Sequence, residues 1–203
     1  MMGQAGMAEA AVRYLRSTGT APFARPVEAL PRPELRCVRE NERVPVDQSD
    51  FRRVLGNFAS GVTVVTAPAP DPDTAPAGFA CQSFSSLSLD PPLVAFMVGR
   101  TSTSWPRIAR AGVFCVNILS AGQGELCRSF AVRGADKFAG VTHDPSPVSG
   151  SPRLAGTLAW IDCTIHAVHT GGDHLIVVGR VDALDTGDGE DAAPLLFHKG
   201  HFL

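Results

Sequence analysis

The chain has 203 residues, of which 44% are hydrophobic, enough to bury one sizeable core but not two. Its 18 lysine and arginine residues nearly balance 20 acidic residues, so the net charge of -2 gives no reason to expect a nucleic acid or a membrane as a partner. No apolar run approaches the roughly 18 residues of a membrane span, no secretory signal is visible, and five cysteines form no CxxC pair, so we expect a cytoplasmic protein with reduced thiols.

Residues 1–46 differ in composition from the rest of the chain. They contain seven arginines, five prolines and no lysine. Each proline lacks a backbone donor and clashes with a preceding helical turn, so the segment cannot sustain a long helix. We therefore expect a flexible N-terminal extension over 1–46 and a folded domain over 47–203.

The folded part begins with a pattern that predicts a helix. Ser49 is a suitable N-cap, and the apolar residues that follow it recur at helical spacing: Phe51, Val54, Leu55 and Phe58. This spacing places the four side chains on one face. The helix should end near Gly61, where the pattern changes.

Short apolar runs of strand length follow, separated by Gly, Pro and Asp clusters. They cover residues 62–66, 78–84, 93–98, 114–119 and 194–197. Residues 157–169 alternate, with every second residue from Ala159 to Ala167 apolar, and the turn Gly-Gly-Asp leads into 174–184, which predicts a hairpin. Six or seven strands with short helices favour a mainly β protein with an antiparallel barrel over a doubly wound sheet.

Three other patterns were weighed as a dinucleotide-binding turn, a metal site and a nucleophilic triad, and none of them is supported. Gly122 and Gly124 after a strand imitate a dinucleotide-binding turn, but Cys127 stands where the third glycine belongs. His166 and His169 lie three apart on a predicted strand and so face opposite sides, and we expect no metal site. No serine or cysteine stands in the sequence context of a nucleophilic triad.

Hydroxyl side chains are concentrated around the strand at 93–98. The stretch GRTSTSW follows this strand, and SFSSLSLDPP precedes it. In the first stretch the pattern predicts Ser104 as an N-cap with Pro106 in the first helical turn. The backbone N–H groups at the start of this helix would then point toward the same position as the hydroxyl groups. A cation beside donors at this position predicts a site for an anion such as a phosphate.

Residues 51–203 resemble the flavin reductase family, the FMN-binding split-barrel reductases of two-component monooxygenases. The resemblance is carried by ordered segments: FRRVLGNFASGVTVVT, GFACQSFSSLSLDPPLV, GVFCVNIL, DKFAGV, GGDHLIVVGRV and PLLFHKG. Within the family, GFACQSFSSLSLDPPLV, SWPRIARAGVFCVN and AWIDCTIHAVHTGGDH are most similar to the reductase component of the actinobacterial secosteroid (3-HSA) hydroxylase.

This resemblance implies an FMN-binding split β-barrel, a six-stranded antiparallel Greek-key barrel with short flanking helices, which forms a homodimer. It implies an enzyme that uses NADH or NADPH to reduce FMN or FAD and supplies reduced flavin to a partner monooxygenase in steroid or aromatic catabolism. Two alternatives stay open: a split-barrel flavin or heme binder without activity, and a flavoprotein that oxidises its own substrate. The choice between FMN and FAD is also open, because many relatives read Thr-x-Asn-Ser where this chain has 80–83.

The resemblance also implies site residues. Those beside the flavin ring and ribityl chain are Ala77, Gly78, Phe79, Ala80, Gln82 and Ser83. Those around the phosphate are Ser85, Ser86, Gly99, Arg100, Thr101, Ser102, Thr103 and Ser104, with Lys137 as a nearby cation. His174 would face the nicotinamide as the catalytic residue, in a pocket that is also lined by Phe197, His198, Lys199 and Gly200.

Overall fold

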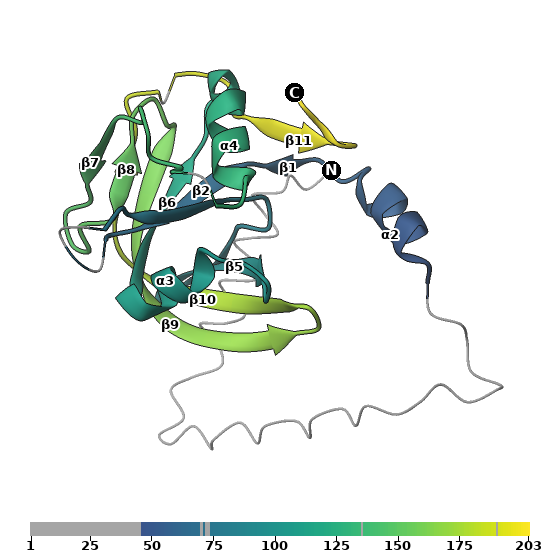
Figure 1. The fold of residues 1–203 in the computed structure, drawn as a ribbon, viewed down its shortest axis with the longest axis horizontal. Helices are drawn as coiled ribbons and strands as arrows, with labels where there is room; N and C mark the ends of the chain where they lie inside the picture. Colours follow the sequence, from purple (N-terminus) through teal and green to yellow (C-terminus); the bar gives the residue numbers. More distant parts are fainter. Residues whose placement is uncertain (1–45, 70, 72–73, 135, 190) are drawn as a thin grey trace, which may run out of the picture. The chain divides into compact units, whose positions relative to one another are not determined.

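A computed structural model describes residues 46–203, except 70, 72–73, 135 and 190 (Figure 1). The expected extension over 1–46 therefore lies almost entirely outside the described residues. Seven of the described strands form one large sheet, in which every ladder is antiparallel, as the sequence predicts. Its order is β3 (Ala77–Cys81), β2 (Thr63–Ala67), β6 (Val113–Ile118), β9 (Ala159–Gly171), β10 (His174–Thr186), β5 (Pro92–Gly99) and β4 (Ser85–Leu89).

Smaller elements surround this sheet. β1 (Ser60–Gly61), β11 (Leu196–His198) and β12 (His201–Phe202) form a three-stranded sheet, and β7 (His143–Pro145) pairs with β8 (Pro152–Leu154). The helices of the described residues are α2 (Gln48–Leu55), α3 (Trp105–Ala111), the 3-10 turn η1 (Ala121–Gln123) and α4 (Gly124–Ala131). No helix in the described part of the chain has the length and apolar character required to cross a membrane.

The sheet curves into a barrel that one serine side chain helps to close. Ser83 follows β3, and its Oγ donates to the Met97 carbonyl and accepts from the Met97 N–H, both at 2.9 Å. These bonds replace a pair of ladder bonds between β3 and β5. The predicted strand over 78–84 is thus wrong in its second half, because the chain leaves the sheet at Cys81 and pairs again as β4 against β5.

The barrel interior is packed around aromatic rings. Phe96 lies within 5.2 to 6.2 Å of the ring centres of Phe79, Trp105 and Phe114. A second cluster packs beneath α4 and includes Val62, Val64, Leu119, Cys127 and Phe130. Since both clusters are filled by side chains, the barrel offers its rim and loops for binding, and not its interior.

Helix α2 differs from the prediction at both ends. Asp47, not Ser49, is the N-cap, because its Oδ1 accepts from the backbone N–H groups of Ser49 and Asp50 at 2.8 and 3.3 Å. The helix ends at Leu55 and not near Gly61. Its predicted apolar face is present but uncovered: the exposed fractions are 56% for Phe51, 55% for Val54, 54% for Leu55 and 81% for Phe58.

The β9–β10 hairpin is confirmed, with a turn at Gly172 and Asp173. A bulge interrupts its alternation: Ile165 pairs with Gly179 and Ala167 with the adjacent Val178, so His166 is an extra residue on β9. Gly179 faces the core, where an added Cβ would meet the Phe114 ring at 2.3 Å. Ala167 therefore lies on the opposite face from Ile165, so the prediction from the alternation, that every second residue from Ala159 to Ala167 lies on one face, is wrong at Ala167.

Candidate functional site

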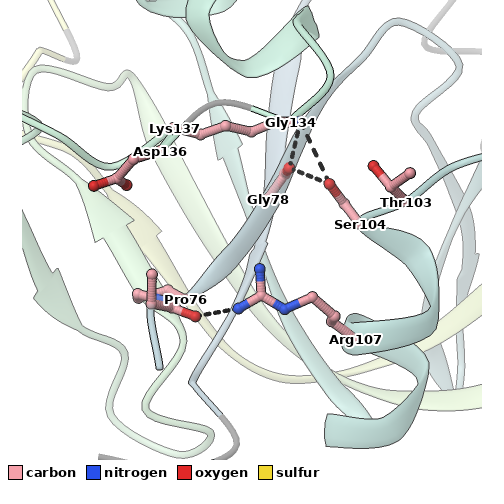
Figure 2. Close-up of a pocket in the computed structure, with 9 residues that line it drawn as sticks. Pro76, Gly78, Thr103, Ser104, Arg107, Gly134, Asp136 and Lys137 are labelled. Atoms are coloured by element: carbon pink, nitrogen blue, oxygen red, sulfur yellow. Dashed lines mark hydrogen bonds between the residues drawn. The ribbon is translucent and has the colours of Figure 1, made fainter. Parts of the chain in front are cut away.

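A pocket of about 310 Å³ lies between β3, α3 and the loop after α4 (Figure 2). We call it the cationic pocket; its lining residues are Ala75, Pro76, Gly78, Thr103, Ser104, Arg107, Gly134, Asp136 and Lys137. Four of them were expected around a flavin from the sequence: Gly78, Thr103, Ser104 and Lys137. The fold thus brings together residues that are up to 59 positions apart.

Lys137 projects its ammonium group toward the protein (Figure 2). Nζ donates to the carbonyl oxygens of Phe130 and Gly78 at 2.9 and 3.1 Å, and to the Ser104 Oγ at 3.4 Å. Burial lowers the pKa of this lysine, since removal from water disfavours the charged form. All three acceptors are neutral, so Lys137 gives the pocket a positive field although its N–H donors are engaged within the protein.

Ser104 occupies the expected N-cap position of α3 but does not cap the helix with its side chain. Its buried hydroxyl donates to the Gly78 carbonyl at 2.9 Å. The capping acceptor is Ser102, whose Oγ accepts from the Trp105 N–H at 3.2 Å. The Ser104 hydroxyl therefore ties α3 to β3, and its expected contact with a ligand stays a prediction.

Ser102→Ala should lower the unfolding free energy by about 1 kcal/mol, the usual effect of losing a capping side chain. For a domain of this size that corresponds to about 2 to 4 °C in melting temperature. Differential scanning calorimetry of the two proteins measures the change. Thr103→Ala is the matched control, because Thr103 is exposed and lies in the same loop. Equal melting temperatures for Ser102→Ala and the original protein would contradict the capping role.

Arg107 is the cation of this pocket that was not expected from the sequence. Its Nη2 donates to the Ala75 carbonyl, which engages one of the five N–H donors of the guanidinium group. Arg107 stands three residues after Ser104, about one helical turn, so it lies on the same side of α3. That spacing in SWPRIAR is the signal by which sequence reasoning could have found it.

The charge of the cationic pocket suits an anion. Arg107 and Lys137 outnumber the single carboxylate of Asp136, and Thr103 adds an exposed hydroxyl. An arginine fork with hydroxyl donors is the usual arrangement for a phosphate group. The residues present therefore fit the phosphate that the family resemblance implies.

Other residues expected around the phosphate lie elsewhere. Arg100 is exposed, and its N–H donates to the Asp173 carbonyl at 3.0 Å, while Thr101 Oγ1 accepts from Arg133 at 3.3 Å. Ser85 and Ser86 lie exposed on β4, where the Ser85 hydroxyl donates to the Ser86 carbonyl. Among the described residues that line the cationic pocket, none of these four is present.

The β3 residues expected beside the flavin ring have side chains that are packed within the protein, so mainly their backbone groups are available to a ligand. The Ala77 side chain is buried, Phe79 packs against Phe96, and Ala80 packs against the cluster beneath α4. Gly78 cannot carry a side chain in this packing, since an added Cβ would lie 2.7 Å from the Phe130 ring. Close approach to this part of β3 would therefore involve backbone groups.

His174 begins β10 directly after the hairpin turn and pairs with Gly99 at the end of β5. The His174 side chain is half exposed, and its Nδ1 lies 2.8 Å from Asp173 Oδ1. This hydrogen bond lowers the pKa of Asp173, because it stabilises the carboxylate. With Nδ1 directed at the carboxylate, Nε2 lies on the side of Gly99.

A second, larger cavity of about 960 Å³ lies between α2 and the turn that joins β11 to β12. We call it the α2 groove; its lining residues are Phe51, Arg52, Arg53, Leu55, Gly56, Asn57, Phe58, Gln82, Phe197, Lys199 and Gly200. It brings Gln82 together with three of the five residues expected near the nicotinamide, all except His174 and His198. The Lys199 N–H donates to the Gly56 carbonyl at 3.0 Å and ties the turn to the end of α2.

The described cysteines are not suited to nucleophilic chemistry. Cys81, Cys115, Cys127 and Cys163 are free and buried. Burial raises the pKa of each thiol, and that of Cys115 to about 12. A thiol needs a lowered pKa to react at neutral pH, so the described part of the site binds and orients without a cysteine nucleophile.

Known proteins are similar to this chain in both sequence and fold. Residues 55–203 match the model of the flavin reductase like domain. The chain is 48% identical over 157 residues to the reductase subunit HsaB of a flavin-dependent monooxygenase from Rhodococcus jostii, which covers 77% of each protein. The family match over 55–203 includes the whole barrel, the cationic pocket and the β11–β12 turn.

Two solved structures are similar as well. Nitrilotriacetate monooxygenase component B from Mycobacterium thermoresistibile superposes with a TM-score of 0.72 at 49% identity, covering 77% of this chain and 85% of that one. The NADH:FAD oxidoreductase SgcE6 of Streptomyces globisporus, in complex with NAD and FAD fragments, gives 0.70 at 36% identity, covering 79% and 96%. The fold, the cation-lined pocket and these matches lead to one conclusion: the chain belongs to the flavin reductase family.

Proposed function

We propose that this protein is an NAD(P)H-dependent flavin reductase that supplies reduced flavin to a partner monooxygenase. The observation that carries the proposal is the match of residues 55–203 to the flavin reductase like domain, which spans the barrel and the cationic pocket. Relatives support the two halves of the activity: one is a reductase subunit of a flavin-dependent monooxygenase, and another is an NADH-dependent FAD reductase. A role in steroid or aromatic catabolism is part of the same proposal.

The cationic pocket would hold the phosphate of FMN, or the corresponding phosphate of FAD. Arg107 and Thr103 would contact the phosphate directly, and the positive charge of Lys137 would stabilise the negative charge of the phosphate. Ala77 to Ala80 would approach the ring with their backbone, with Gln82 and Ser83 at the far end of this segment. Ser85, Ser86 and the turn from Gly99 to Ser102, which the resemblance implies around the phosphate, remain part of the proposed flavin site. A bound flavin supplies the hydride acceptor of the reaction.

His174 would position the nicotinamide. Asp173 accepts from Nδ1 and so fixes the imidazole ring, which leaves Nε2 as an acceptor for the carboxamide N–H of the nicotinamide. Gly99 opposite His174 has no side chain, so it leaves space beside the ring. Hydride transfer depends on the orientation of the two rings and needs no proton transfer by the protein. A contact that positions the nicotinamide therefore contributes by holding the reacting atoms in line.

Steady-state absorbance at 340 nm tests the proposed activity. The purified full-length protein with NADH should show rapid loss of absorbance when FMN or FAD is added, and a negligible rate without flavin. Repeating the assay with NADPH ranks the two nicotinamide substrates. Failure of both nicotinamide substrates with both flavins would contradict the proposal and favour a non-catalytic flavin or heme binder.

We propose a homodimer. Apolar side chains lie exposed on neighbouring strands β4, β5 and β10: Leu87, Leu89, Met97 and Ile176. Met97 and Ile176 are register partners, so they form one apolar surface and not scattered contacts. Burial of this surface against a second copy would remove it from water. A cytoplasmic location is also proposed, and the four free thiols of the described residues support it.

Protein that lacks residues 1–45 should retain the NADH:flavin activity and the dimer of the full chain. We propose that residues 1–46 are an extension and that 47–203 form the catalytic domain, since the domain match begins at residue 55. Sedimentation velocity and the 340 nm assay on both proteins measure the outcome. A monomer, or an activity reduced more than about threefold, would assign the extension to the functional fold.

A further inference from the structure

A third cavity, of about 230 Å³, lies between the β7–β8 pair, the start of β9 and the end of β10. We call it the Arg153 cavity; its lining residues are Asp144, Arg153, Leu154, Ala155, Thr157, Trp160, Thr186, Gly187 and Asp188. Among the described residues it shares no lining residue with the cationic pocket or the α2 groove. The proposed reaction therefore gives this cavity no role.

Arg153 gives the cavity a cation that the Trp160 ring holds in place. The Arg153 Cζ lies 4.8 Å from the centre of that ring, and the face of an indole ring attracts a guanidinium group. The Arg153 side chain is only partly exposed, and its buried Nε has no hydrogen-bond partner among the described residues. Arg153 is also in none of the ion pairs between described residues. The guanidinium group is thus oriented in advance for an anion that enters the cavity.

Two carboxylates line the same cavity. Asp144 is the register partner of Arg153 on the β7–β8 ladder, so the two side chains start from the same face of this pair. Asp188 belongs to the segment after β10, where its Oδ1 accepts from the Gly156 N–H at 2.7 Å. A simple anion would be attracted by one charge of the cavity and repelled by two. A small molecule with both an anionic and a cationic group would find a partner for each.

Backbone hydrogen bonds fix two walls of the cavity relative to each other. The Gly187 N–H donates to the Leu158 carbonyl at 2.7 Å, and the Gly189 N–H donates to the Thr157 carbonyl at 3.1 Å. A Cβ added to Gly187 would overlap the Thr157 carbonyl oxygen, so glycine allows the two segments to lie this close. The cavity is therefore formed by the fold itself, and a ligand would not have to order these walls.

We infer that the Arg153 cavity binds a small α-amino acid, with its carboxylate on Arg153 and its ammonium group between Asp144 and Asp188. A planar guanidinium group binds a carboxylate through two parallel N–H···O bonds, and an ammonium group has three donors for carboxylate oxygens. The volume of about 230 Å³ lies below the usual range for drug-sized ligands, which selects an amino acid with a short side chain. The inference does not depend on the proposed reductase function.

Three ligands with related skeletons test the inference. L-Alanine carries both charged groups, propionate lacks the ammonium group, and ethylamine lacks the carboxylate. Isothermal titration calorimetry of the full-length protein should detect L-alanine, and propionate and ethylamine should each bind about tenfold or more weakly, because each loses a charge-assisted contact. L-Alanine should also raise the melting temperature, since a ligand that binds only the folded state stabilises it.

Variants of the charged residues give a second readout. Arg153→Gln should weaken the binding of L-alanine by about tenfold or more, whereas Arg110→Gln is the matched control, because Arg110 is an exposed arginine at the end of α3. The double variant Asp144→Asn, Asp188→Asn retains the oxygen that accepts from Gly156 and removes both negative charges. It should bring the affinities for L-alanine and propionate to within about twofold of each other, a ratio that a purely structural role would leave unchanged.

Several results would overturn the inference. They are no binding of L-alanine to the original protein, propionate bound as tightly as L-alanine, or equal affinity of L-alanine for the original protein and Arg153→Gln. The comparison of the three ligands needs no variant, so it decides the question even if Arg153→Gln does not fold. Loss of the NADH:flavin activity in the 340 nm assay would contradict the proposed function alone and leave the amino-acid site standing.

Discussion

His174→Ala should slow flavin reduction by NADH on the order of tenfold or more while leaving the affinity for oxidised flavin unchanged. The imidazole is fixed by Asp173 and faces the gap beside Gly99, so its loss frees the nicotinamide to adopt unproductive orientations. Displacement by about 1 Å is enough to produce losses of this size in oriented reactions. Stopped-flow bleaching of the flavin absorbance at saturating NADH measures the rate directly.

Asp173 provides the companion experiment. Asp173→Ala retains the imidazole but removes the acceptor that orients it, so the expected bleaching rate lies between those of the original protein and His174→Ala. If His174 served only to end the hairpin, both variants would lower the melting temperature and weaken the binding of flavin and NADH together. An unchanged bleaching rate in His174→Ala would remove this residue from the reaction.

Arg107→Ala should weaken the binding of FMN on the order of tenfold or more and change the binding of riboflavin little. Only FMN carries the phosphate that the guanidinium group is proposed to contact, and Arg–phosphate bonds are strong because both partners are charged. Quenching of flavin fluorescence on titration with protein gives both dissociation constants. Arg107→Lys should recover only part of the loss, since lysine retains the charge but not the planar pair of donors.

Arg100 separates two placements of the phosphate. It lies in the same turn as Thr101 but outside the described lining of the cationic pocket, so Arg100→Ala should affect FMN less than Arg107→Ala does. The reverse order, or equal losses of FMN and riboflavin in Arg107→Ala, would move the phosphate out of the cationic pocket. In either variant an unchanged melting temperature excludes a general loss of structure.

The antiparallel strands were predictable from the sequence because each depends on a local pattern. Alternation over 157–169 and the Gly-Gly-Asp turn specify a hairpin through neighbours in the chain, and helical spacing specifies the apolar face of α2. The same local patterns could not show that this face is uncovered, because burial depends on what the rest of the chain places beside it. The predicted ends of α2 were also wrong. At its start Asp47, one residue before the helix, is the N-cap in place of Ser49.

In the candidate site, the chain itself points to a cation and hydroxyls after β5, and the hydroxyl pattern predicted an anion site there. Which hydroxyls are engaged within the protein was decided only by tertiary structure: the Ser104 side chain bonds the Gly78 carbonyl, and Ser83 bonds Met97 across the barrel. Arg107 becomes a pocket residue only because β3 and the loop before Lys137 lie beside α3. Residue types are local properties of a sequence, whereas hydrogen-bond partners are brought together by packing between distant segments, so a buried donor bonds an acceptor that only the fold places within reach.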